Sequence, residues 1–118
     1  MPENASLDNM LVDNAQEMGL TLTSYVKLFR MAVAETRADM AVLEKSIEAG
    51  DFVHIQAISH RLKGTCANVH LPMLAVPAGE INALAKKAED IGQVRDFFLQ
   101  LKKSFETLQG MTGTGSVQ

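Results

Sequence analysis

Three residues in one short run could carry out phosphoryl chemistry: His60, Lys63 and Gly64. A neutral imidazole nitrogen can attack a phosphoryl group near neutral pH, because its lone pair is available without a strong base. The product is a phosphoramidate, from which the phosphoryl group is readily passed on. A lysine three residues later would supply positive charge for the phosphoryl oxygens. Glycine in a helix interior costs about 1 kcal/mol against alanine, so Gly64 calls for a reason, such as the close approach of another protein.

The spacing of these residues predicts that they share one face of a helix over residues 51–71. The same face carries the short or uncharged residues Gln56, Ala57 and Ala67. The opposite face carries an apolar stripe made of Ile55, Ile58, Leu62, Cys66 and Val69. A stripe of this width is suited to packing against other helices. We therefore expect His60 to point outward from a helical core.

The rest of the chain shows the same helical periodicity and few strand signals. We expect helices over residues 6–17, from residue 21 or 23 to 49, and over 51–71, 72–89 and 93–108. Four substantial helices with short connections predict an all-α fold, an up-down antiparallel four-helix bundle with an additional short N-terminal helix.

Proline and glycine mark the boundaries of this domain. Pro72 is suited to a helix first turn. Pro77 predicts a kink, or a short turn before a helix that starts near that residue. Residues 1–109 are expected to form one bundle domain. Residues 110–118, most of which are glycine or polar residues, are expected to form a flexible C-terminal tail.

Composition narrows the classes of function. The net charge is −3 and no stretch gathers basic residues, so we expect no nucleic-acid partner. No run approaches the roughly 20 apolar residues of a membrane span, so we expect no membrane partner and a cytoplasmic location, as a stand-alone protein or as a piece of a larger receptor. His54 and His70 do not share the face of His60, so we expect no metal site. Cys66 is expected to be a buried small hydrophobe.

The run His60-Arg61-Leu62-Lys63-Gly64 resembles the His-x-Leu-Lys-Gly motif of histidine-containing phosphotransfer (Hpt) domains. The similarity extends upstream through the corner at residues 48–51 and downstream through Leu74, Ala78 and Ile81. It covers most of residues 20–108. Hpt domains are four-helix-bundle intermediates of multistep phosphorelays, a form of two-component signal transduction.

This resemblance implies that His60 is phosphorylated on Nε2 and that Lys63 helps to hold the phosphoryl group. The group would come from a receiver-domain aspartate or a histidine kinase and pass to a receiver-domain aspartate of a response regulator. The receiver would supply Mg²⁺, so the chain would bind no cofactor of its own and would be a carrier, not an enzyme. We expect a monomer that docks its partners on a surface around His60, formed by Gln56, Ala57, Arg61, Gly64, Ala67 and Asn68.

Two positions depart from the family pattern. Members often have glycine ten residues after the histidine, where the active helix ends, whereas this chain has His70. Members also often place Glu or Gln twenty-two residues after the histidine, to bond its other ring nitrogen. Here that residue is Asn82, whose shorter side chain could still accept the Nδ1 proton of His60. Glu80 is the weaker substitute, because it lies about 200° away around the helix.

Three other functions fit parts of the pattern. The phosphoacceptor domain of a chemotaxis-type histidine kinase is a close neighbour of the first hypothesis. The dimerisation hairpin of a kinase fits less well, because Arg61 replaces the usual acid and no Thr-Pro follows. A non-catalytic helical adaptor would make the pattern around His60 a coincidence.

Overall fold

The computed structural model describes residues 3–111, and every regular element in that range is an α-helix. The helices are α1 (Glu3–Glu17), α2 (Leu22–Glu48), α3 (Phe52–Asn68), α4 (Pro72–Lys86) and α5 (Ile91–Met111). This confirms the all-α prediction and the number of helices.

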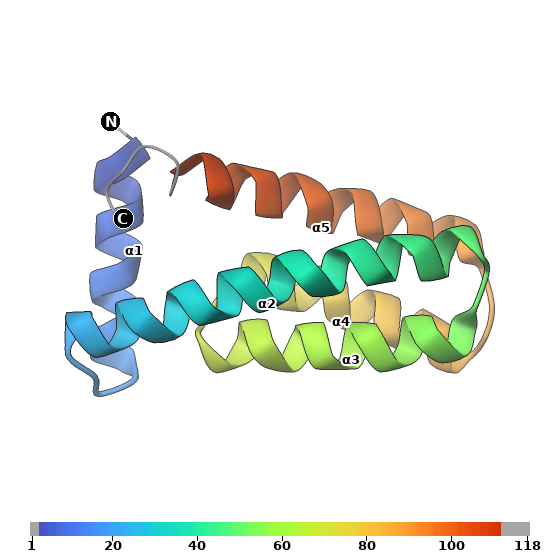
Figure 1. Cartoon of the computed structure of the whole chain (residues 1–118), viewed down its shortest axis with the longest axis horizontal. Coiled ribbons are helices and arrows are strands. Elements are labelled where there is room, and N and C mark those ends of the chain that lie inside the picture. The colour runs from blue at the N-terminus through green and yellow to red at the C-terminus, as the bar shows by residue number, and fades with distance from the viewer. Residues whose placement is uncertain (1–2, 112–118) are drawn as a thin grey trace.

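Four of the helices form the bundle. In Figure 1, α2, α3, α4 and α5 run alternately forward and back along the long axis of the molecule. The remaining helix, α1, crosses one end of this bundle and contacts α2 and α5. The expected up-down topology with an additional N-terminal helix is therefore confirmed.

The core receives large apolar side chains from every helix. Fully buried examples are Leu7 from α1, Tyr25, Phe29 and Leu43 from α2, Ile55 and Leu62 from α3, Leu74 and Ile81 from α4, and Val94 and Leu101 from α5. Burying a side chain of this size stabilises the fold by about 1.5–3 kcal/mol. The burial of these apolar side chains, which recur at helical spacing in each segment, thus stabilises the packing of the helices.

Specific residues set the ends of α2 and α3. The side chains of Thr21 and Asp51 accept hydrogen bonds from the backbone N–H groups of Ser24 and His54. These bonds satisfy donors that the first turn of a helix leaves unpaired. Gly50 has φ +66°, in the left-handed region that ends a helix at little cost when the residue is glycine. The α2–α3 corner therefore lies where the sequence predicted it.

Pro77 lies inside α4, which continues unbroken from Pro72 to Lys86. The expected alternative of a helix that starts near Pro77 is therefore wrong. The proline removes one backbone donor from the helix, but the residue itself is buried. Tertiary packing of α4 thus outweighs the local cost.

The last helix is longer than its apolar pattern suggested. It starts at Ile91 and ends at Met111, so the expected domain boundary after residue 109 falls inside α5. The expected tail, from residue 112 on, lies outside the described residues.

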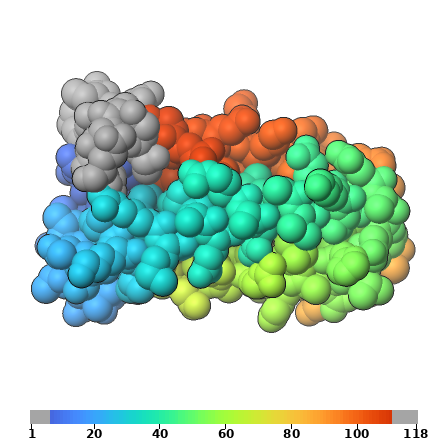
Figure 2. Space-filling view, in the orientation of Figure 1, coloured from blue at the N-terminus to red at the C-terminus, as the bar shows by residue number. Residues whose placement is uncertain are grey.

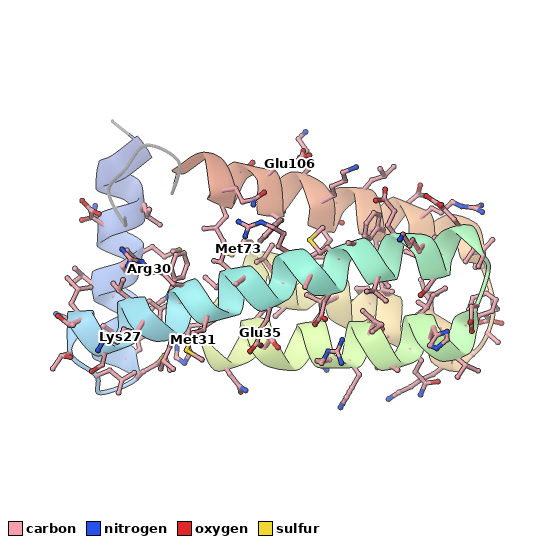
Figure 3. The ribbon with its side chains drawn as sticks, viewed as in Figure 1. Lys27, Arg30, Met31, Glu35, Met73 and Glu106 are labelled. Atoms are coloured by element: carbon pink, nitrogen blue, oxygen red, sulfur yellow. The ribbon has the colours of Figure 1, made fainter. Side chains whose placement is uncertain are left out.

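The outer face of α2 occupies the middle of the view in Figure 2, between α5 and α3. Figure 3 shows Lys27, Arg30, Met31 and Glu35 along this helix, and all four are exposed. Within residues 3–111, no helix combines the length and apolar character needed to cross a lipid bilayer.

Candidate phosphotransfer site

The register of α3 turns His60 away from the core. Ile55, Leu62 and Cys66 are completely buried on the inner side of α3. His60 and Lys63 are exposed on the outer side. A helix with a 3.6-residue period and one buried stripe must present the remaining positions to solvent. The outward histidine predicted from spacing is therefore where the structure places it.

His60 lines a surface hollow of about 470 Å³ between α3 and α4. The other lining residues are Val53, Gln56, Ala57, Asn82 and Lys86. Among the described residues, none forms a hydrogen bond or an ion pair with the His60 ring. Its nitrogens are thus open to a reacting group that enters the hollow.

Asn82 is close to His60, but its amide has a different partner. The side chain is buried, and Nδ2 donates a 2.9 Å hydrogen bond to the backbone carbonyl oxygen of Gln56 in α3. The hydrogen bond that we expected between Asn82 and His60 is not formed within residues 3–111. Instead, Asn82 joins α4 to α3 one turn before His60. Its shorter side chain reaches the nearest helix backbone, and this bond satisfies the buried amide of Asn82.

Lys63 lies over α4. A β-carbon built on Gly79 would lie 3.4 Å from Cδ of Lys63, so the lysine stem passes over the glycine backbone. Lys63 lines a second hollow, of about 510 Å³, which also contains Ala67 and Glu80. The structure thus places Lys63 next to the hollow of His60 and not inside it. Glu80, the weaker substitute for Asn82, also lines this second hollow.

Gly64 faces open space. No heavy atom outside its own helix neighbourhood lies within 4 Å of a β-carbon built at this position. The fold itself therefore does not need a glycine here, in contrast to Gly50 with its positive φ. Close approach of another molecule remains the physical reason that fits.

The remaining residues of the expected docking surface are all exposed: Gln56, Ala57, Arg61, Ala67 and Asn68. Arg61 also has a structural role that the sequence did not indicate. Its Nη2 and Nε donate hydrogen bonds of 2.7 and 3.1 Å to the two carboxylate oxygens of Asp39 in α2. This two-point pairing fixes the guanidinium beside the site, and the Arg61 side chain is still 61% exposed.

His70, which stands where the resemblance predicts a glycine, has a backbone conformation that favours glycine. Its φ is +58°, and the N–H groups of His70 and Leu71 bond back to the carbonyl oxygens of Ala67 and Cys66. These two hydrogen bonds close the end of the helix in a way that is usually seen with glycine at this position. The Nδ1 atom of His70 also lies 3.0 Å from Oε2 of Glu17 in α1. The substitution therefore leaves the end of α3 intact.

Cys66 is buried, and its Sγ lies 3.5 Å from Oγ1 of Thr36. Burial raises the pKa of the Cys66 thiol, which keeps it protonated and unreactive. Within the described part of the chain, no three His, Cys, Asp or Glu side chains are grouped to hold a metal ion.

Comparison with known families gives the same assignment as the geometry. A family model for the Hpt domain matches residues 27–111, from the second turn of α2 to the end of α5. The chain belongs to the Hpt family. Neither a curated protein nor a solved structure matches it. Hpt domains are phosphotransfer carriers of phosphorelays, without a catalytic site of their own, and they interact with receiver domains and histidine kinases.

Lys86 is a residue that our sequence interpretation of the site left out. It is four residues after Asn82 on α4, so the two share a helix face, and both line the hollow of His60. That spacing was a signal in the sequence. However, it could be used only once the packing of α4 against α3 was known.

Proposed function

We propose that this Hpt domain carries a phosphoryl group on Nε2 of His60. It accepts the group from the aspartyl phosphate of a receiver domain or from a histidine kinase, and passes it to the aspartate of another receiver. The observation that carries this proposal is the exposed His60 ring at a hollow between α3 and α4, with none of its nitrogens engaged by the described residues.

The transfer step needs a nucleophile with a free electron pair. The neutral Nε2 atom of His60 attacks phosphorus, a P–N bond forms, and the P–O bond to the receiver aspartate breaks. The departing carboxylate takes the bonding electrons, and Nδ1 keeps its proton. The reverse step passes the phosphoryl group to a second receiver. In both directions the receiver supplies the Mg²⁺ and the carboxylates that bind it, so this chain contributes only the nucleophile and its surroundings.

Docking requires an accessible surface around the nucleophile. The exposed, small or uncharged side chains of Gln56, Ala57 and Ala67 leave room for a receiver domain, and Gly64 leaves more. Asn68 extends this surface toward the end of α3. Arg61, held by Asp39, presents the exposed part of its guanidinium to the receiver in a fixed position. The Lys63 ammonium flanks the same surface and supports the incoming phosphoryl oxygens.

The test is incubation of the chain with a receiver domain phosphorylated with radioactive phosphate. The wild type should take up acid-labile label, and His60→Gln should take up none. His54→Gln is the matched control, because His54 is exposed, lies on the same helix and bonds only to Asp51. It should be labelled like the wild type. If His60→Gln accepts label as well as the wild type does, the proposal is wrong.

A further inference from the structure

The hollow of His60 contains one positively charged side chain, and that side chain comes from α4. Of the six residues that line the hollow, His60 and Lys86 are the only two with titratable side chains. No carboxylate lines it. A phosphoryl group carries a charge of about −1.5 to −2 near pH 7. A phosphoryl group that projects from His60 into this hollow would therefore share the hollow with the positive charge of Lys86.

The packing of α4 against α3 sets the position of Lys86. The hydrogen bond from Asn82 to the Gln56 carbonyl oxygen joins the two antiparallel helices at this point. Lys86 lies one turn beyond Asn82, on the same face of α4, and borders the hollow beside Val53. A lysine carries its charge on a flexible four-carbon stem. Its ammonium can therefore move toward a new anion without any movement of the helix.

The two lysines near His60 differ in their surroundings. Lys63 shares its hollow with Glu80, and its stem lies against Gly79. Lys86 shares its hollow with no acidic residue, and within residues 3–111 it forms no ion pair. The charge of Lys86 is thus not offset by a neighbouring carboxylate in that hollow.

We propose that Lys86 is a second phosphoryl-binding cation of this site. It acts from α4, whereas Lys63 acts from α3. The proposal rests on the proposed function, because it assigns to Lys86 a contact with the phosphoryl group on His60. In this arrangement the phosphoryl oxygens are held between two ammonium groups, one from each helix. Lys86 speeds the arrival of the phosphoryl group and slows its loss to water.

Phosphoramidate is a suitable probe, because it is a small anionic donor that needs no docking surface. His60 attacks phosphorus, the P–N bond of the donor breaks, and ammonia leaves. Lys86→Ala and Lys86→Gln should lower the rate of phosphorylation about threefold to tenfold, and Lys86→Arg should largely restore it. The difference from the wild type should shrink as the salt concentration rises. Lys87→Ala is the matched control, since it removes the same charge from the adjacent exposed position, which does not line the hollow.

The outcomes separate the two proposals. If the wild type is phosphorylated on His60 and Lys86→Ala and Lys86→Gln behave like Lys87→Ala, the role of Lys86 is wrong and the carrier function stands. If His60→Gln is phosphorylated as well as the wild type, both proposals are wrong. Equal thermal unfolding curves for the Lys86 and Lys87 variants would show that a rate difference does not come from loss of the fold. If Lys86→Ala and Lys86→Arg both unfold at a lower temperature than Lys87→Ala, and both lose rate to the same extent, Lys86 has a structural role and its phosphoryl contact is wrong.

Discussion

The hydroxyl group of Tyr25 donates a 2.6 Å hydrogen bond to the backbone carbonyl oxygen of Val69, forty-four residues later in the chain. Tyr25 is in the first turn of α2, and Val69 ends α3. The Nδ2 group of Asn14 in α1 donates 3.0 Å hydrogen bonds both to the Tyr25 oxygen and to the carbonyl oxygen of His70. Three helices are therefore joined where the phosphotransfer helix ends.

Removing only the Tyr25 hydroxyl tests this junction. Tyr25→Phe keeps the buried ring but leaves the Val69 carbonyl oxygen without its donor. We expect the free energy of unfolding to fall by about 1–3 kcal/mol, the cost of an unsatisfied buried polar group. Urea denaturation followed by circular dichroism measures this change. Asn14→Ala, which removes the donor to the Tyr25 oxygen and to the His70 carbonyl oxygen, should also destabilise the protein. A Tyr25→Phe variant as stable as the wild type would contradict the role of the hydroxyl.

The ionisation of Tyr25 gives an independent measurement. Burial raises the pKa of the Tyr25 phenol above its ordinary value of 10.0, although the Asn14 hydrogen bond partly opposes the rise. A group with a raised pKa in the folded state stabilises the fold fully below its unfolded pKa, and this contribution is lost as the pH rises through the folded value. Tyr25 is the only tyrosine and the chain has no tryptophan, so tyrosinate absorbance reports this residue alone. The midpoint should lie above 10 in the native protein and near about 10 in urea.

Two helix ends allow a paired test of backbone strain. Ala88 follows α4 with φ +51°, whereas Gly50 follows α2 with φ +66°. An L-residue with a side chain pays about 1 kcal/mol or more in this left-handed region, and glycine does not. Ala88→Gly should therefore raise the free energy of unfolding by about 1 kcal/mol, and Gly50→Ala should lower it by about 1 kcal/mol. Changes of the same sign in the two variants would contradict the assignment.

Gly64 should separate folding from docking. Because a β-carbon at Gly64 meets open space, Gly64→Ala should raise the free energy of unfolding by up to about 1 kcal/mol. Gly64→Gln should fold as well, yet it should slow phosphotransfer from a receiver domain by obstructing close approach. Phosphorylation by phosphoramidate should change little, because that donor is small. Equal slowing with both donors would show that the glycine acts on the chemistry and not on docking.

Cys66 should be protected in the native fold. Burial raises its thiol pKa, and the side chain is completely buried. Alkylation by iodoacetamide near pH 8 should therefore be far slower in the native protein than in urea, since the thiolate is the reactive form. Cys66 is the only cysteine, so mass spectrometry of the intact chain measures its modification directly. Equally fast alkylation in both states would contradict the burial.

The sequence alone determined the properties that depend on neighbours along the chain. Helical spacing placed His60 opposite the buried side chains of Ile55 and Leu62, and the structure agrees. Thr21, one of two candidates, and Asp51 begin their helices as expected, because capping bonds reach only three residues along the chain. These patterns are local, and so they survive without knowledge of the fold.

The tertiary structure decided what lies across from each helix. Three features of the site depend on how two helices pack. They are the pairing of Arg61 with Asp39, the bond from Asn82 to Gln56 instead of His60, and the position of Lys86 at the edge of the hollow. Register and distance between helices are set by the fit of many core side chains at once, which no single stretch of sequence specifies. The same packing keeps α4 helical at Pro77 and keeps His70 at φ +58°. In both places the energy of the assembled core exceeds the local cost that the sequence predicted.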